Sequence, residues 1–163
     1  MVYVFKKIPH EKAVVIGGGT PSHIDYYRNL FRTIPNVQFL GYLPDDEAYS
    51  LLASSRLFVF PSYEEGFGLV IGEVMALGIP IVCYDIPALI EVWDNAVHFI
   101  KTGNKEALFE EVSTLIKDDN RLNEMSEKGL EYITNFDWQN VVNRETEILW
   151  KLCRSVNHEN MLG

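Results

Sequence analysis

Five short apolar runs in this chain alternate with longer segments that have the periodicity of α-helices. The runs are rich in β-branched and aromatic residues, as β-strands are, and they lie at 13–17, 37–41, 57–61, 79–84 and 96–100. Consecutive strands that are separated by helices need crossover connections, so their sheet is expected to be parallel, with helices on both faces. The pattern therefore predicts an α/β fold, a Rossmann-like doubly wound parallel sheet.

The predicted helices lie between these runs and after them. Their expected ranges are 21–34, 44–55, 68–78, 87–93, 105–118, 121–134 and 137–154. The last three follow the final strand, which predicts extra C-terminal helices beyond the sheet, and Asp137 is a suitable cap for the last of them. Residues 1–12 are expected to form a helix that leads into the first strand. With 163 residues, the chain is expected to be a single domain over 1–163.

Composition excludes several classes of partner. A net charge of −9 repels nucleic-acid phosphates, and Lys and Arg form no dense cluster, so no nucleic acid is expected. No window of 18 apolar residues occurs, and the start does not resemble a signal peptide, so membrane contact through this domain is not expected. Cys83 and Cys153 belong to no metal-ligand or redox spacing, and His10, His23, His98 and His158 are scattered, so the sequence predicts no metal site. Reduced thiols predict a cytoplasmic protein.

The stretch "PSYEEGFGLVIGEVMALGIPIV" at 61–82 carries the strongest candidate site. It begins at the carboxyl end of the predicted strand at 57–61, where sheets of this class bind ligands. Gly66 and Gly68 allow tight backbone geometry before the next helix. The free N–H groups of Gly68, Leu69 and Val70 would point outward at that helix N-terminus, where the helix dipole favours an anion.

Glu73 is unusual because it lies inside the long apolar run of this stretch. A glutamate is rarely buried without a partner, since removing its charge from water costs several kcal/mol. Glu73 therefore either lies on the edge of the helix that faces a cleft, or pairs with a buried base. On a cleft wall its carboxylate could accept hydrogen bonds from a vicinal diol, such as that of a ribose. The alternative without a ligand is a glutamate on a partly exposed edge of a core helix.

The same stretch resembles the signature of glycosyltransferase family four, retaining enzymes of the GT-B fold. Glu65 and Glu73 have the E-x7-E spacing of that signature, with Gly-Phe-Gly-Leu between them. "AVVIGGGTPS" is similar to the glycine loop of the family, and "NVQFLGYLPDDEAYSLLASSRLFVFPS" to the segment before the motif. "LIKDDNRLNEMSEKGLEYITNFDWQNVVNRETEILWKL" is similar to its closing helices, so about residues 5–152 are covered.

The resemblance implies a role for each matching residue. Glu65 would contact hydroxyls of the transferred sugar, Glu73 would hold the ribose of a nucleotide-sugar donor, and the N–H groups that open the helix would hold its diphosphate. The backbone after the strand at 37–41 would line the base pocket. The implied catalytic residue is Glu65, and the implied donor-binding residues are Glu73, Gly66, Phe67, Gly68, Leu69, Val70, Tyr42, Leu43, Gly17 and Gly18.

The resemblance also implies parts that this sequence does not match. Relatives have an N-terminal acceptor domain, and the first strand of their second domain carries an Arg and a Lys that neutralise the donor diphosphate. Lys6, Lys7 and Lys12 follow the matching place. Losing such a cationic clamp would strongly weaken transition-state stabilisation. We therefore expect this nucleotide-sugar-binding half to have no useful transferase activity alone.

The function expected from the resemblance is that of a donor-binding domain, in an enzyme that transfers a hexose-type sugar to a saccharide or lipid acceptor. A UDP- or GDP-sugar is the expected donor and the missing N-terminal domain the expected partner, with no metal or other cofactor. Two alternatives stay open: a non-catalytic module that binds sugar nucleotides, and a fragment of a sugar-nucleotide epimerase.

Overall fold

The computed structural model describes the backbone of residues 1–159, and the side chains of these residues except Trp138 and 155–159. The chain divides into two compact units, Met1–Leu130 and Glu131–Gly163. The first unit contains every strand that the structure describes. That residues 1–163 form a single domain stays a prediction.

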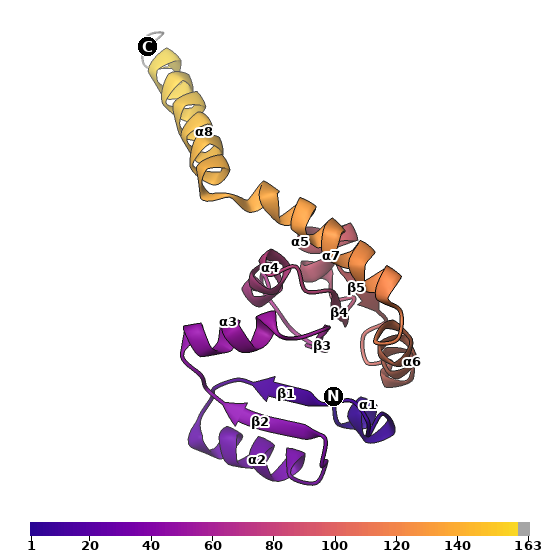
Figure 1. The fold of residues 1–163 in the computed structure, drawn as a ribbon. Helices are drawn as coiled ribbons and strands as arrows, with labels where there is room; N and C mark the ends of the chain where they lie inside the picture. Colours follow the sequence, from indigo (N-terminus) through magenta and orange to yellow (C-terminus); the bar gives the residue numbers. More distant parts are fainter. Residues whose placement is uncertain (160–163) are drawn as a thin grey trace. The chain divides into compact units, whose positions relative to one another are not determined.

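The described strands pair in parallel, as predicted. β1 (Ala13–Ile16) pairs with β2 (Val37–Gly41), and β3 (Phe58–Phe60) pairs with β4 (Ile81–Tyr84), which also pairs with β5 (His98–Ile100). Helices separate consecutive strands along the chain (Figure 1). The described order therefore confirms an α/β fold built from parallel strands and crossover helices.

The helices follow the predicted segments with small changes at their ends. They are α1 (Val2–Lys7), α2 (Pro21–Phe31), α3 (Asp45–Ala53), α4 (Leu69–Ala76), α5 (Pro87–Trp93), α6 (Lys105–Leu115), α7 (Asp119–Ile133) and α8 (Trp138–Glu159). Two short 3-10 helices, η1 (Asp94–Ala96) and η2 (Thr134–Phe136), complete the described elements. The predicted strand at 96–100 is shorter in the structure because η1 takes up its first residue.

The strand pairing differs from one continuous sheet. β1 and β2 form a two-stranded sheet, whereas β3, β4 and β5 form a three-stranded sheet. Within the described residues, no strand pairs with both β1 and β3, so the hydrogen-bond ladder is interrupted there. All residues of β4, which has a neighbour on each side, are buried, while those of β3 are half-buried. The doubly wound architecture is thus present as two short parallel sheets.

The core of the first unit joins the N-terminal helix to the strands. Val4 and Phe5 of α1 belong to the same buried cluster as Leu108, Val112 and Leu115 of α6. The other buried members of this cluster are Phe31, Ile34, Val37, Val82, Tyr84, Ile100 and Leu122. Each fully buried side chain of this size contributes roughly 1.5–3 kcal/mol, so the predicted N-terminal helix is a packed part of the fold.

The Asn36 side chain fastens the segment between α1 and β1. Its Nδ2 group donates to the carbonyl oxygens of Phe5 at 3.1 Å, Ile8 at 3.1 Å and Glu11 at 2.8 Å. One amide group therefore provides hydrogen bonds to a carbonyl in α1, that of Phe5, and to two carbonyls of the loop between α1 and β1. The position of β1 beside β2 follows from this contact and from the strand pairing.

Gly78 ends α4 in the way the sequence predicts. It adopts φ of 71°, its N–H donates to the Met75 carbonyl at 2.9 Å, and the N–H of Ile79 donates to the Val74 carbonyl at 3.3 Å. These two bonds form a Schellman motif, which requires a left-handed residue that is usually glycine. The hydroxyl of Ser126 on α7 also donates to the Gly78 carbonyl at 2.6 Å. Both ends of α4 are therefore fixed by glycines, since Gly68 precedes it.

The second unit is helical where it is described. Asp137 has extended backbone angles, and its carbonyl accepts from the N–H of Val141 at 3.1 Å, so it occupies the N-cap position of α8 as predicted. Along α8 large apolar side chains are exposed at Val142, Ile148, Leu149, Trp150 and Leu152. Among the described helices, none combines the length and the apolar character that a membrane-spanning segment requires.

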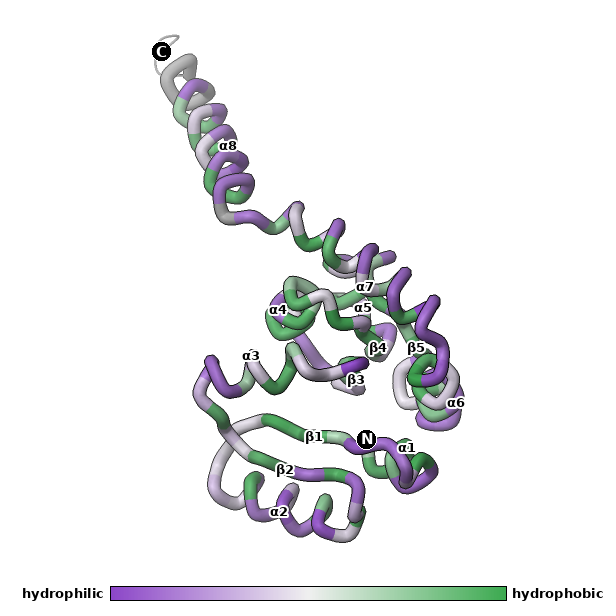
Figure 2. Tube along the Cα trace, viewed as in Figure 1, coloured by the Kyte–Doolittle hydropathy of each residue, from purple (hydrophilic) through white to green (hydrophobic). Residues whose placement is uncertain are grey.

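The distribution of apolar residues explains which elements are central. Figure 2 shows α4 as mostly hydrophobic, and its residues Ile71, Val74 and Met75 are buried. α7 carries a larger share of hydrophilic residues, and its buried positions are Leu122 and Gly129. α4 is thus a core helix, and the position of Glu73 on it therefore bears on the candidate site.

Candidate functional site

The loop at 61–68 connects β3 to α4 and is held by contacts on both sides. The hydroxyl of Ser62 donates to the Glu64 carbonyl at 3.0 Å, which tightens the start of the loop. The indole Nε1 of Trp93 donates to the Phe67 carbonyl at 2.8 Å, and the two rings meet edge to face with centroids 5.3 Å apart. Because Trp93 is buried, it positions the end of the loop from within the core.

Gly68 is the residue at which this loop turns into α4. It is buried, it adopts φ of 73°, and it occupies the N-cap position of the helix. A Cβ atom at this position would lie 2.6 Å from Cδ2 of Leu89 and 3.4 Å from Nε1 of Trp93. Both the backbone angle and the space therefore require glycine.

The N-terminus of α4 has free backbone donors, as the sequence predicts. No side chain of the described residues caps this helix. Among the described residues, the N–H groups of Gly68, Leu69 and Val70 have no acceptor. The Gly68 carbonyl accepts a hydrogen bond from the N–H of Ile71 at 2.8 Å. Uncapped N–H groups and the positive end of the helix dipole together favour an anion at this place.

The structure excludes one of the alternatives for Glu73, a pairing with a buried base. Ile71, Val74 and Met75 are buried, whereas Leu69 and Glu73 are exposed and lie one helical turn apart. Residues four apart share a face of a helix, so α4 has one exposed edge that runs from its N-terminus to Glu73. Glu73 lies on that edge and is not paired with a buried base.

Tyr49 of α3 contacts Glu73. Its hydroxyl lies 3.2 Å from Oε1 of Glu73 and donates a hydrogen bond to it. This hydrogen bond and the negative charge of the carboxylate raise the pKa of Tyr49 above its usual range, with a smaller contribution from the charge of Asp45. The phenol therefore stays a donor at neutral pH. α3 and α4 are joined at the candidate site by this bond.

The site residues that were predicted to precede α4 lie in the loop at 61–68. Glu65 is half-buried, and Gly66 and Phe67 are exposed. The loop geometry places all three directly before the free N–H groups of α4. The structure therefore brings Glu65, Gly66 and Phe67 to the same helix N-terminus that the sequence motif predicts.

The loops after β1 and β2 lie against each other. The N–H of Gly17 donates to the Gly41 carbonyl at 2.9 Å. A Cβ atom at Gly18 would lie 3.9 Å from Cβ and Cδ2 of Tyr42, whose side chain is 73% exposed. Gly17, Gly18 and Tyr42, with Leu43 following, thus lie together at the carboxyl ends of β1 and β2.

Two residues at the site were not predicted from the sequence. Trp93 fixes the end of the loop at 61–68, and Tyr49 contacts Glu73. "PALIEVW" indicates only a short amphipathic helix, and nothing in "PDDEAYSLLASS" distinguishes Tyr49 from a core tyrosine. Their roles depend on contacts 26 and 24 residues away along the chain, which local patterns do not contain.

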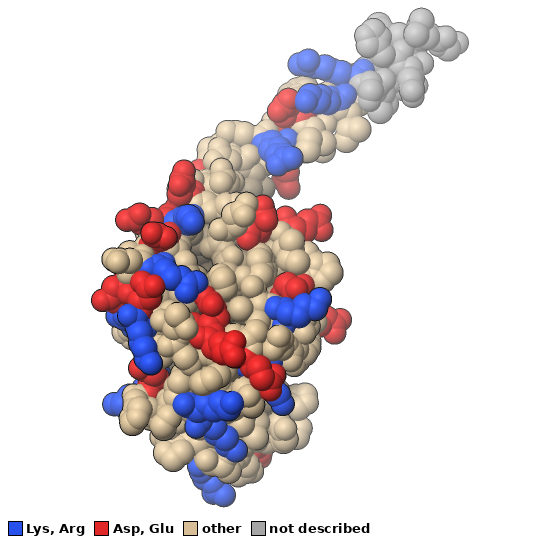
Figure 3. All heavy atoms as spheres, turned by 90° about the vertical axis from the view of Figure 1, so that its right-hand side faces the viewer, with Lys and Arg blue, Asp and Glu red and all other residues tan. Residues whose placement is uncertain are grey.

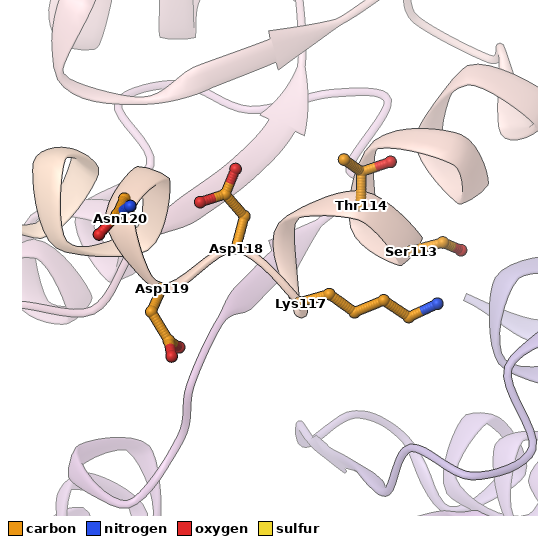
Figure 4. A pocket seen from close by; sticks show the side chains of 6 residues that line it. All are labelled: Ser113, Thr114, Lys117, Asp118, Asp119 and Asn120. Carbon is orange, nitrogen blue, oxygen red and sulfur yellow. The ribbon is translucent and has the colours of Figure 1, made fainter.

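A hollow on the surface of the first unit lies away from these residues. It is lined by Ser113, Thr114, Lys117, Asp118, Asp119 and Asn120, at the turn between α6 and α7. Figure 4 shows that the Asp118 and Asp119 carboxylates point away from each other. Two acids beside a single lysine do not favour an anionic ligand, so this hollow adds nothing to the candidate site.

The charges of the molecule agree with a local rather than a general anion site. On the face drawn in Figure 3, basic side chains lie among acidic ones, and the net charge of the whole sequence is −9. Within the residues that the structure describes, no three His, Cys, Asp or Glu side chains gather as metal ligands.

Solved structures share this fold. HepE from Anabaena, crystallised with UDP, aligns with a TM-score of 0.78 and 21% identity over 91% of this chain and 44% of its own. The C-terminal domain of LpcC from Francisella tularensis, described as a glycosyl transferase group 1 family protein, aligns with a TM-score of 0.67 and 22% identity. It matches 82% of this chain and 73% of that domain. These likenesses support the Rossmann-like fold.

Sequence comparison gives the family. O-antigen chain mannosyltransferase B from Escherichia coli is 35% identical over 104 residues, which are 64% of this chain and 27% of that protein. The chain thus spans about a quarter of the length of this relative. The family model "Glycosyl transferases group 1" matches residues 2–132, which include both glutamates and every loop of the candidate site. The chain belongs to the group 1 glycosyl transferases.

Proposed function

We propose that this chain is the donor-binding part of a retaining glycosyltransferase of family four, and that the loop at 61–68 and the exposed edge of α4 hold a nucleotide-sugar. The observation that carries the proposal is the geometry of α4. Its uncapped N-terminus and Glu73 lie on one exposed edge of an otherwise buried helix. A nucleoside diphosphate has both an anion and a diol, so one ligand could occupy both.

Each part of the donor then has a binding group. The N–H groups of Gly68, Leu69 and Val70 would bind the diphosphate, with Gly66 and Phe67 shaping the approach. The Glu73 carboxylate would accept hydrogen bonds from the ribose hydroxyls. Glu65, at the mouth of the loop, would contact hydroxyls of the sugar.

The base would lie at the surface formed after β1 and β2. Gly18 leaves room beside Tyr42, and the backbone at Tyr42 and Leu43 offers donors and acceptors to a base. HepE from Anabaena has been crystallised with UDP and with UDP-glucose, which supports UDP as the first nucleotide to test. GDP is the second.

In the complete enzyme the acceptor oxygen would bond to the anomeric carbon while the bond from that carbon to the diphosphate breaks. Both events would occur on one face of the sugar, which retains its configuration. The donors at α4 would stabilise the charge that develops on the departing diphosphate. The acceptor, here proposed to be a saccharide or a lipid, would bind on a separate N-terminal domain.

The family match supports this function over the two alternatives, a binding module and an epimerase fragment. That the enzyme needs no metal, that it is cytoplasmic and that this chain alone has no useful transferase activity stay predictions. Turnover of a UDP- or GDP-sugar by the purified 163-residue chain would contradict the last of these.

The experiment is a titration of the chain with UDP, GDP, ADP and CDP, followed by NMR of the backbone amides. We expect shifts at 66–74 and 41–43 with one nucleotide. Glu73→Ala should weaken binding by roughly 1.5–3 kcal/mol, the value for lost hydrogen bonds to a charged acceptor. Glu127→Ala, which removes an exposed glutamate from α7, is the matched control.

Two results would refute the proposal. If no nucleotide shifts these amides at millimolar concentration, the site does not bind a donor. If Glu73→Ala binds as tightly as the parent chain, the ribose is held elsewhere.

A further inference from the structure

Glu73 is joined to α3 by one hydrogen bond. The Tyr49 hydroxyl donates to Oε1 of Glu73 at 3.2 Å, and among the described residues Oε2 accepts no hydrogen bond. Tyr49 is an exposed residue of α3, so its hydroxyl meets the carboxylate of exposed Glu73 at the surface. One oxygen of the Glu73 carboxylate, Oε1, is therefore held by a hydrogen bond, and the other oxygen, Oε2, is free to accept one from a ligand.

A free glutamate on an exposed helix edge has three rotatable bonds. A ligand that uses its carboxylate must immobilise those bonds, and the lost freedom weakens binding. A hydrogen bond that already fixes the carboxylate removes part of this loss. A tyrosine is well suited to the task because it has only two rotatable bonds before its ring.

We propose that Tyr49 is a positioning residue of the donor site, which orients the Glu73 carboxylate toward the ribose hydroxyls of a nucleoside diphosphate. The proposal rests on the proposed function of Glu73. With the Tyr49 hydroxyl on Oε1, Oε2 and the second lone pair of Oε1 stay available to the 2′- and 3′-hydroxyls. Tyr49 acts through Glu73 and does not itself need to contact the nucleotide.

The opposite role is also chemically possible, so the test must separate the two. If the Tyr49 hydroxyl competed with the ribose for Oε1, its removal would tighten nucleotide binding. If Tyr49 only packed α3 on α4, its removal would weaken the binding of every nucleotide equally. Positioning of Glu73 affects only ligands that carry ribose hydroxyls.

The experiment measures the affinity of the 163-residue chain for UDP and GDP, and for their 2′,3′-dideoxy analogues, by calorimetry. The variants are Tyr49→Phe, which removes only the hydroxyl, and Glu73→Gln. Tyr26→Phe is the matched control, because Tyr26 is an exposed tyrosine on α2. A second readout is the carbon-13 shift of the Tyr49 Cζ atom, which reports directly on the hydrogen bond to Glu73.

We expect Tyr49→Phe to weaken binding of the ribose-bearing nucleotide about three- to tenfold, as for one lost hydrogen bond, and to leave the dideoxy analogue unchanged. Tyr26→Phe should change neither affinity. The Tyr49 Cζ shift should move in Glu73→Gln and on nucleotide addition to the parent chain.

The proposal is overturned if Tyr49→Phe binds the ribose form as well as or better than the parent chain, or weakens both forms equally. If Glu73→Gln loses the ribose preference while Tyr49→Phe keeps it, the proposed function stands and only the role of Tyr49 is wrong. If the parent chain binds neither UDP nor GDP, both the donor site and this proposal fail.

Discussion

Substitution of Gly68 by alanine tests the most constrained position of the site. A non-glycine residue with the left-handed backbone angles of Gly68 costs roughly 1–2 kcal/mol. Its Cβ atom would also lie 2.6 Å from Cδ2 of buried Leu89, and overpacking of this kind typically costs about 1–3 kcal/mol. The lower entropy of the unfolded alanine chain returns about 0.4–1 kcal/mol. These values together predict a loss of about 1.5–4 kcal/mol in the free energy of unfolding.

The assay is urea unfolding followed by tryptophan fluorescence, since Trp93 lies beside Gly68. For a slope of about 1–3 kcal/mol per M, the midpoint should fall by about 0.5 M or more. Gly66→Ala is the matched control, because Gly66 lies two residues away, has no positive φ, and a Cβ atom there would have nothing within 4 Å. If Gly68→Ala is no less stable than Gly66→Ala, the proposed constraint is wrong.

The two causes can be separated by also shortening Leu89. In a Leu89→Ala background the contact with the new Cβ disappears, but the backbone strain at Gly68 stays. After the same unfolded-chain term is subtracted, we therefore expect Gly68→Ala to cost about 0–1.6 kcal/mol in that background, less than in the parent chain. An unchanged cost would show that the side chain of Leu89 has no part in the effect.

Two further predictions concern groups whose pKa the fold shifts. Burial raises the pKa of Cys83 to about 12, with a contribution from the Asp85 charge. Iodoacetamide at pH 8 should therefore alkylate exposed Cys153 and should reach Cys83 only in urea. Equal labelling of both thiols in the folded chain would contradict this. The hydroxyl and N–H of Thr102 donate to Asp85 and lower the pKa of its carboxyl. The stabilisation that the Asp85 carboxylate gives to the fold is therefore fully present above its unfolded pKa of about 4 and is lost as pH falls through the lower folded pKa. The difference in urea midpoint between the parent chain and Asp85→Asn should therefore be larger at pH 7 than at pH 2, and a constant difference would refute this.

The elements that the sequence predicted well are those whose own residues determine them. β2 occupies the predicted residues 37–41, and α4 ends at Gly78 because a glycine in the left-handed region ends a helix. The strand expected at 96–100 begins later, at His98, since the chain leaves α5 through the 3-10 turn at Asp94–Ala96. An apolar run indicates burial but does not show where strand pairing starts.

The sequence pattern did not predict the division into two sheets, because it does not contain the strand order. Alternating strands and helices predict parallel pairing, and each described pair is parallel. Which strands become neighbours depends on how the crossovers are placed. β2 leads through α3 to β3, yet β3 pairs with β4 and not with β1 or β2.

The candidate site was predictable where backbone chemistry defines it. Glycines before a helix and a glutamate inside an apolar run indicated free backbone donors and a carboxylate near them, and α4 has an uncapped N-terminus and an exposed Glu73. Tyr49 and Trp93 were not predictable, because each acts through a tertiary contact to a residue in another element. The residues that offer binding groups were thus evident from local sequence, whereas the residues that hold them in place were not.

The exposed edge of α4 combines three kinds of surface. It has free N–H groups at its start, the apolar side chain of Leu69, which is 70% exposed, and the carboxylate of Glu73 one turn further. Inorganic phosphate could use only the first of these, and a free sugar only the second and third. A nucleoside diphosphate has an anion, apolar ring faces and a diol in one molecule. The presence of all three on a single core helix is therefore the strongest physical argument for a nucleotide-linked ligand at this site.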